Sequence, residues 1–336
     1  MTGSKNNRTR LCLAALLTAL FCPAFARSQE VARQALSAFP PDTQQVAYVN
    51  LAELRSLPNY RQLRGILFNR QMIYFEQFLR SIGADPEKDV DEAVVGWRGA
   101  PTKSSPLFGL AAGRFNVVEA QNSIAQESLP AAQYQGFTLD AFGAGHSSQD
   151  LFFTFFNEGL AGFGRLTDLK ALIDGYLGRR PTLNSNPDFV KWEGNLDGSA
   201  PEWGITTGKA ALNVAVPWLA GVPGLSGPSG LSDRAGQKGG LESVIGPVKA
   251  VLYQANWGAN FSAEISIICE NAQSAQTLAE LLSVWRDSSA LTGKRPADVN
   301  NFIQGLEINA SGNEVTLDGQ GPPAAVAQLL QNALAH

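Results

Sequence analysis

The sequence predicts an α+β fold built from two tandem ferredoxin-like, or split βαβ, halves, with mostly antiparallel sheets and helices on one face of each half. Three observations lead to this prediction. Segments with strand-like alternation and segments with helical periodicity follow one another in the order β-α-β-β-α-β-β-α. That order occurs twice, and a stretch rich in polar and turn residues near residue 184 separates the two occurrences.

The first half is predicted to span residues 27–184. Its strand-like segments cover 45–50, 93–97 and 106–115, and the stretches 134–142 and 150–164 are expected to give a hairpin or meander. Helical periodicity is found over 51–54, 58–82, 116–127 and 168–177, with Gly83 ending the second helix. Asn116 and Thr167 are the expected N-caps of the last two helices, because their short polar side chains can accept a backbone hydrogen bond.

The second half is predicted to span residues 185–336 and to repeat this order, with Asn186 capping a helix that begins at Pro187. Its expected strands cover 203–207, 248–253, 260–270, 302–308 and 314–318. Its further expected helices are 212–219, a helix capped by Asn271 that reaches about residue 286, and a final helix from Pro322-Pro323.

One segment breaks the correspondence between the halves. Residues 221–240 are rich in Gly, Pro and Ser and stand where the first half has its long helix. This composition is typical of a mobile loop. A lid or partner-binding loop and a spacer left by a lost helix are both consistent with it.

Residues 1–26 have the layout of a cleavable secretory signal peptide. Lys5, Arg8 and Arg10 precede an apolar run over 11–22, which Pro23 ends, and Ala24-Phe25-Ala26 places small residues at the cleavage site. A spanning helix needs roughly 20 apolar residues, so this run is short for a membrane anchor. Acylation at Cys22 is disfavoured because Phe21 is bulky. We therefore expect an exported protein, periplasmic or extracellular, with no membrane span after signal removal.

The composition of the chain after the signal excludes several classes of function. Removal of Lys5, Arg8 and Arg10 leaves 23 basic against 30 acidic residues, a net charge of −7, which argues against nucleic acid as a partner. Cys269 is then the single cysteine, so no intramolecular disulfide can form. Its strand-like context predicts a buried small side chain rather than a nucleophile.

Metal and cofactor chemistry finds little support in the sequence, and we predict neither a metal site nor a cofactor. The mature chain has two histidines, His146 and His336, whereas zinc needs three or four nitrogen or sulfur ligands. The acid-rich stretch 84–92 lacks EF-hand spacing and is expected to be a solvated turn. No phosphate-binding loop or dinucleotide motif is present.

Catalytic residues cannot be assigned from the sequence. His146 lies close to Asp140 and Asp150, but the flanking Gly143 and Gly145 favour a turn between strands over a catalytic triad. Ser226 and Ser229 do not match the Gly-x-Ser-x-Gly nucleophile elbow. The 30 acidic residues allow many carboxylate pairs for glycoside hydrolysis, and no pattern selects one of them.

The tryptophans offer a second approach to a sugar-binding surface, because indole rings stack on sugars. Five of the six lie after residue 185, at positions 192, 203, 218, 257 and 285. Trp285 falls on the apolar side of a helix and is expected in the core. Trp257 falls in an expected turn, where it would be exposed, although core or turn packing is the favoured interpretation.

Three passages together resemble a group of exported bacterial proteins that is catalogued only as a domain of unknown function. They are 41–51 (PDTQQVAYVNL), 83–95 (GADPEKDVDEAVV) and 186–189 (NPDF). The resemblance implies a bacterial periplasmic or secreted protein with a duplicated α+β fold. It supplies no catalytic residues.

The leading functional hypothesis is a non-enzymatic exported protein that binds an envelope protein or a small ligand through its sheets or the cleft between its halves. One alternative is a secreted hydrolase with paired carboxylates, which requires two facing acids and at least one strongly shifted pKa. Another is an envelope assembly or scaffold protein, which requires an exposed apolar patch. The sequence does not determine the oligomeric state.

Overall fold

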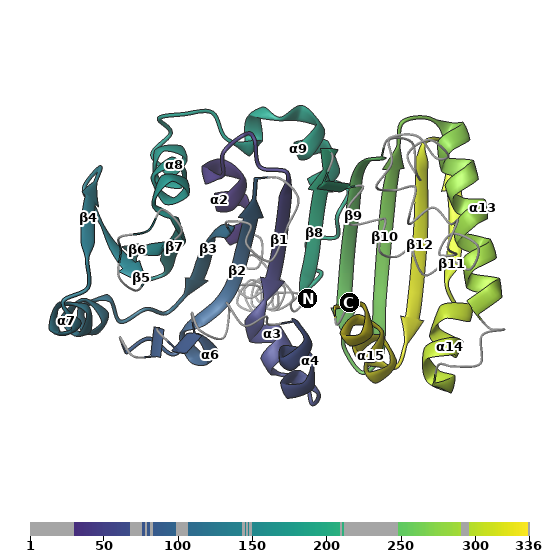
Figure 1. Cartoon of the computed structure of the whole chain (residues 1–336), viewed down its shortest axis with the longest axis horizontal. Helices are drawn as coiled ribbons and strands as arrows, with labels where there is room; N and C mark the ends of the chain where they lie inside the picture. The colour runs from purple at the N-terminus through teal and green to yellow at the C-terminus, as the bar shows by residue number, and fades with distance from the viewer. Residues whose placement is uncertain are drawn as a thin grey trace, which may run out of the picture.

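A computed structural model gives the fold of the chain (Figure 1). It describes residues 30–67, 76–77, 79–80, 83–98, 107–142, 145, 147, 150–208, 210–211, 248–289 and 296–334. The signal segment, the loop 221–240, His146 and most of the expected helix 212–219 therefore lie outside the described residues.

The described strands form one antiparallel sheet of twelve strands. Their order across the sheet is β11-β12-β10-β9-β8-β1-β2-β3-β7-β6-β5-β4. In chain order the strands are β1 (Gln45–Asn50), β2 (Val90–Trp97), β3 (Leu107–Gly113), β4 (Ala131–Tyr134), β5 (Phe137–Phe142), β6 (Leu151–Asn157), β7 (Leu160–Arg165), β8 (Glu202–Thr207), β9 (Val248–Trp257), β10 (Phe261–Cys269), β11 (Glu307–Ser311) and β12 (Glu314–Gly321).

Helices connect the strands and cover the sheet. In the first part of the chain they are α2 (Glu30–Ala38), α3 (Leu51–Arg55), α4 (Tyr60–Leu67), α6 (Pro86–Asp89), α7 (Val117–Glu127) and α8 (Leu166–Tyr176). The later ones are the short η1 (Leu183–Ser185), α9 (Pro187–Glu193), α13 (Ala272–Ser289), α14 (Ala297–Gln304) and α15 (Pro323–Leu334). Among the described residues, no helix is both long and apolar enough to cross a membrane.

The seam between β1 and β8 joins the two parts of the chain into one sheet. The two strands pair antiparallel, with Val46 opposite Ile205 and Tyr48 opposite Trp203. The Tyr48 and Trp203 rings stack at 5.4 Å between centroids. Both side chains are almost fully buried, which makes the seam part of the core rather than a contact between separate sheets.

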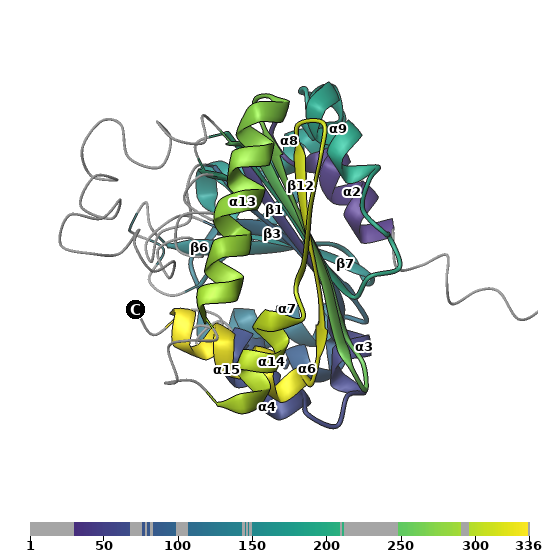
Figure 2. The same cartoon turned by 90° about the vertical axis from the view of Figure 1, so that its right-hand side faces the viewer.

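The two faces of the sheet are covered by different helices (Figure 2). We call one side the α2 face. There Val46, Tyr48, Trp203, Ile205 and Leu252 pack in one core cluster with residues of α2 and α9 and with Leu172 of α8. We call the other side the α13 face, where Val251, Ile267, Val315 and Leu317 pack against α13 and α14.

The expected placement of helices on one face of each half is not found. In the second part, α9 packs on the α2 face with Leu252, while α13 and α14 pack on the α13 face. In the first part, Val94 and Leu110 pack under α2, while their neighbours Val95 and Ala111 pack on the other side against the cluster of Ile124 from α7. Consecutive apolar residues along a strand place apolar surface on both faces, so helices are needed on both.

The split βαβ strand order is also not found. In that arrangement, the two strands that flank a helix run parallel with a third strand inserted between them. Here β1 and β2, which flank α3 and α4, pair directly and antiparallel. The α+β class and the antiparallel sheet are therefore confirmed, and the ferredoxin-like order is not.

Several local predictions are confirmed in detail. Asn116, Asn186 and Asn271 cap α7, α9 and α13 by accepting a backbone N–H three residues later. Such caps depend only on a short stretch of chain, which is why the sequence reveals them.

Other local predictions are wrong. Thr167 lies inside α8, whose N-cap is Arg165 and has no side-chain cap bond. The expected strand over 302–308 begins too early, because residues 302–304 still belong to α14 and β11 begins at Glu307. By contrast, the hairpin or meander expected from 134–142 and 150–164 is confirmed, because β4, β5, β6 and β7 pair antiparallel in succession and Tyr134 pairs with Phe137 across a turn. Of the expected helix 58–82, the structure describes α4 to Leu67 and fragments beyond residue 75.

Candidate functional site

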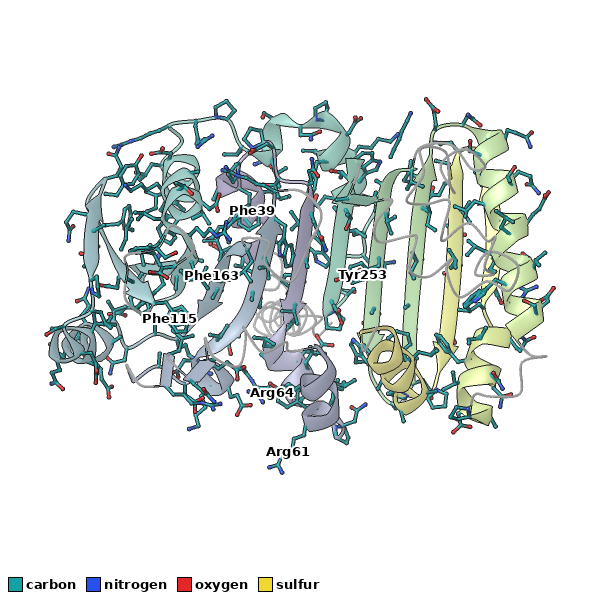
Figure 3. The ribbon with its side chains drawn as sticks, viewed as in Figure 1. Phe39, Arg61, Arg64, Phe115, Phe163 and Tyr253 are labelled. Atoms are coloured by element: carbon teal, nitrogen blue, oxygen red, sulfur yellow. The ribbon has the colours of Figure 1, made fainter. Side chains whose placement is uncertain are left out.

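A hollow of about 280 Å³ opens on the α2 face of the second part of the sheet. Its wall is the loop after α9, with Asn195 and Leu196, and its floor is formed by β9, β10 and β12. The side chains that line the floor are Leu252, Gln254, Glu264, Ser266 and Glu314, next to the backbone of Tyr253. Figure 3 labels Tyr253 on β9, the strand that contributes Leu252 and Gln254 to the floor.

The strand register brings the floor residues together. Leu252 lies opposite Ser266 and Gln254 lies opposite Glu264 across β9 and β10. Glu314 of β12 lies opposite Ile268, two positions beyond Ser266 along β10. Since alternate residues of a strand share a face, all of these side chains project from the same side of the sheet.

A hydrogen-bonded chain holds the wall against the floor. The Gln254 side chain accepts a bond of 2.7 Å from the backbone N–H of Asp197. Its amide nitrogen donates a bond of 2.6 Å to Glu264 Oε2, which orients that carboxylate. The Asp197 carboxylate in turn accepts bonds from the backbone N–H and hydroxyl of Ser199, and these bonds lower its pKa.

Acidic side chains dominate the floor and the strands beyond it. Glu264 lies opposite Asp318, and Asp318 lies opposite Glu307, so three carboxylates follow one another across β10, β12 and β11. Like charges directly opposite on a sheet repel one another. In β9, β10, β11 and β12 the single basic residue is Lys249. This part of the α2 face therefore has a negative potential.

Ser266 is the buried polar group of the hollow. The residue is 9 % exposed, and its hydroxyl makes no hydrogen bond to any other described residue. The hydroxyl oxygen itself stays open to solvent in the hollow. A polar ligand group bound there would take the place of water as its hydrogen-bond partner.

The acids with raised pKa lie elsewhere and in separate places. Burial raises the pKa of Glu92 to about 7, and the hydrogen bond with Tyr48 partly opposes this shift. Burial also raises the pKa of Glu202, whose carboxylate accepts a 2.7 Å bond from the Trp257 indole. Glu92 lies on the same face of the sheet as Tyr48, whereas Glu202 lies on the opposite face. These acids do not form the facing pair that the hydrolase hypothesis requires.

The residues considered in the sequence have varied positions. Asp140 lies buried in β5, where desolvation raises its pKa, and Asp150 accepts a bond from the backbone of Ser147. His146, Ser226 and Ser229 lie outside the described residues. Among the described residues, the structure brings no group of three metal-ligating side chains together.

The expected turn at Trp257 is wrong. Trp257 is 2 % exposed at the end of β9, where its ring packs on Phe261 at 4.5 Å between centroids. The core position expected for Trp285 is confirmed. A strand that continues four residues past the expected end at residue 253 explains the error.

The acid-rich stretch 84–92 forms ion pairs. Asp85 caps the short helix α6 and pairs with Lys88 at 2.9 Å. Arg64 of α4, labelled in Figure 3, pairs with Glu87 at 2.9 Å. Arg55 pairs with Asp91 at 3.0 Å. The Arg64 pair joins α4 to α6, and the Arg55 pair joins α3 to β2.

The residues of the hollow were not identified as a site from the sequence. The alternation of Ser262, Glu264 and Ser266 was a visible signal, since it predicts one polar face for β10. Nothing in the sequence indicated that Glu314 and the loop at Asn195 approach the same place. That convergence depends on the pairing of β10 with β12.

Comparisons with known proteins do not assign the chain to a family. No family model matches the sequence, and no curated protein matches it. Two solved structures of TP0453 are similar to the fold. Crystal form I has 8 % identity and a TM-score of 0.46 over 89 % of this chain and 97 % of that one. Crystal form IV has 11 % identity and a TM-score of 0.48 over 88 % and 96 %.

Proposed function

We propose that the chain is an exported, non-enzymatic binding protein that takes a small ligand in the hollow on its α2 face. The observation that carries the proposal is Ser266, a residue that is 9 % exposed and whose hydroxyl has no hydrogen-bond partner among the described residues, inside a polar hollow. The oriented carboxylate of Glu264 beside it supports the same conclusion. Binding needs only these preformed polar groups, whereas catalysis would need an acid–base pair.

The place where the helical layer ends supports a binding role. The helices α2 and α9 cover the apolar part of the α2 face as far as Leu252. Beyond it the floor becomes polar at Ser266 and Glu264, while the loop at Asn195 and Leu196 remains as a wall. A ligand at this boundary between the apolar and polar parts of the floor would contact both kinds of side chain, which is typical of small-molecule sites.

The exported location is part of the proposal and depends on residues 1–26. Its test is expression of the full chain in a bacterial host, followed by N-terminal sequencing of the protein from the periplasmic fraction. The expected product begins at Arg27. An unprocessed chain retained in the cytoplasm would contradict the proposal.

We also propose that the two halves descend from one duplicated unit. The strand orders β1-β2-β3-β7-β6 and β8-β9-β10-β12-β11 correspond position by position outward from the seam. A helix follows the third strand of each unit, α7 after β3 and α13 after β10. The hairpin of β4 and β5 is an addition to the first unit.

Ligand binding is tested by thermal unfolding of the mature protein with a panel of neutral sugars, amino acids, dicarboxylates and amines. At least one class is expected to raise the melting temperature. The Ser266→Trp variant fills the hollow and is expected to abolish that rise. The matched control is Ser262→Trp, four residues earlier on the same face of β10 and outside the hollow. If no class shifts the wild-type protein, or both variants retain the shift, the hollow is not the site.

A further inference from the structure

The hollow carries a charge pattern that selects among ligand classes. Two carboxylates, Glu264 and Glu314, line it, and none of the described residues that line it is basic. The acidic row continues outward through Asp318 and Glu307. An anionic ligand would be repelled, and a neutral one would leave both carboxylates without a counter-charge.

The carboxylates lie at the two ends of the hollow. Glu314 is level with Ile268, and Glu264 is four residues earlier on the neighbouring strand β10. At about 3.3 Å per residue, this places the two positions about 13 Å apart along the strand direction. A ligand that neutralises both must therefore be elongated, with a positive charge near each end.

The middle of the hollow differs from its ends. Ser266 lies midway between the levels of Glu264 and Glu314, opposite Leu252. Leu252 and Leu196 supply apolar surface on the inner side, and Ser266 supplies the unpartnered hydroxyl. Methylene groups would pack on the leucines, and a central N–H would donate to the Ser266 hydroxyl.

We infer that the hollow binds a linear organic polyamine, with its terminal ammonium groups on Glu264 and Glu314, its central nitrogen at Ser266 and its methylene groups against Leu196 and Leu252. This inference rests on the proposed ligand-binding function and specifies its ligand class. A divalent metal ion fits the site less well, since no three ligating side chains converge in the described part of the chain.

The test is isothermal titration of the mature protein with spermidine at 150 mM NaCl. We expect saturable binding of one molecule per chain. Glu264→Gln and Glu314→Gln should each weaken binding about tenfold, the loss expected for one charge-assisted hydrogen bond. Ser266→Val, which leaves the net charge unchanged, should weaken binding several-fold. N-acetylation of one end of spermidine removes one positive charge, so it should weaken binding by about as much as the loss of one carboxylate.

A matched variant separates a specific site from general attraction to an acidic protein. Glu280 is exposed on α13, on the other side of the sheet, and Glu280→Gln makes the same charge change. Spermidine affinity should be unchanged in this variant. The inference would be overturned if Glu280→Gln and Glu264→Gln weakened spermidine binding equally. It would also be overturned if titration with MgCl2 and with spermidine gave equal binding heats.

The inference and the proposed function can fail separately. If spermidine gives no heat while a sugar or another class raises the melting temperature in a Ser266-dependent way, the polyamine assignment is wrong and the binding site remains. If no class has any effect, both are wrong. Melting temperatures of the variants without ligand show whether each one is folded.

Discussion

Single side chains in this protein have properties that their neighbours in space determine. Cys269 illustrates this at the end of β10, where it is fully buried in the core beneath α13. Burial raises the pKa of its thiol to about 11. The thiolate is the reactive species, so both its access and its population are small at neutral pH.

The thiol of Cys269 should therefore be unreactive in the folded protein. With a chain of residues 27–336, a thiol-specific chromogenic disulfide at pH 8 should detect almost no thiol in buffer. In concentrated urea it should detect one per chain, because Cys269 is the single cysteine after residue 26. Stoichiometric labelling within minutes under native conditions would contradict the buried position.

A second prediction at the scale of single residues concerns Glu92 and the dependence of stability on pH. Its pKa is raised from 4.5 to about 7 in the folded protein, so the folded state binds more protons than the unfolded state between these values. The associated stability is present below about pH 4.5 and is lost as the pH rises through 7. Because the carboxyl is partly exposed, we expect an effect on the order of 1 kcal/mol.

The Glu92→Gln variant removes this titration. Relative to wild type, the variant should be more stable at pH 8 than at pH 5 by that amount, as measured by urea unfolding at both pH values. Glu127→Gln, at an exposed position of α7, serves as the control and should show no such difference. A constant offset between Glu92→Gln and wild type would mean that Glu92 does not titrate in this range.

At the scale of elements, close helix packing depends on small residues. The helices α2 and α8 pack against each other on the α2 face, and Gly175 of α8 is at their closest approach. A Cβ atom at Gly175 would lie 2.2 Å from the backbone oxygen of Ala38. Backbone atoms cannot move away as a flexible side chain can, so the glycine is required there.

Gly175→Ala should consequently destabilise the protein by roughly 1–3 kcal/mol, the usual cost of overpacking. Gly194→Ala is the matched control, because the added Cβ would make only ordinary contacts, the nearest at 3.4 Å from the carbonyl oxygen of Val190. That control should be neutral within about 0.5 kcal/mol. Urea unfolding measures both, and equal stabilities would show that the helices can separate without cost.

At the scale of the whole molecule, the seam determines how the protein unfolds. Ile205 is fully buried on β8, in one core cluster with Val46 and Tyr48 of β1 and with Leu252 of β9. Residues from both halves thus share one core. We therefore expect one cooperative transition, in which tryptophan fluorescence and far-UV circular dichroism give the same midpoint.

Ile205→Ala should lower the stability of both halves together, by about 2–5 kcal/mol. Its fluorescence and circular dichroism midpoints should fall by the same amount. Two separate transitions, with only the second half affected, would show that the halves unfold independently across the seam. The exposed Val284 of α13 offers a comparison, since Val284→Ala should have little effect.

The sequence by itself determined the local features of this protein. Strand alternation at 45–50 and the helix caps at Asn116, Asn186 and Asn271 depend on residues within a few positions of one another, so their patterns are visible in the chain. The α+β class follows from the same local patterns. The error at Trp257 arose because a strand end depends on its partner strand, and β10 extends the pairing to that residue.

Only the tertiary structure decided the strand order, the single sheet and the candidate site. Glu264 meets Gln254 and Glu314 because β10 pairs with both β9 and β12, and Asn195 reaches the hollow from 59 residues before Gln254. Many registers are compatible with the same alternating pattern, and their free energies differ through packing across the whole sheet. The hollow at Ser266 is a product of that choice of register.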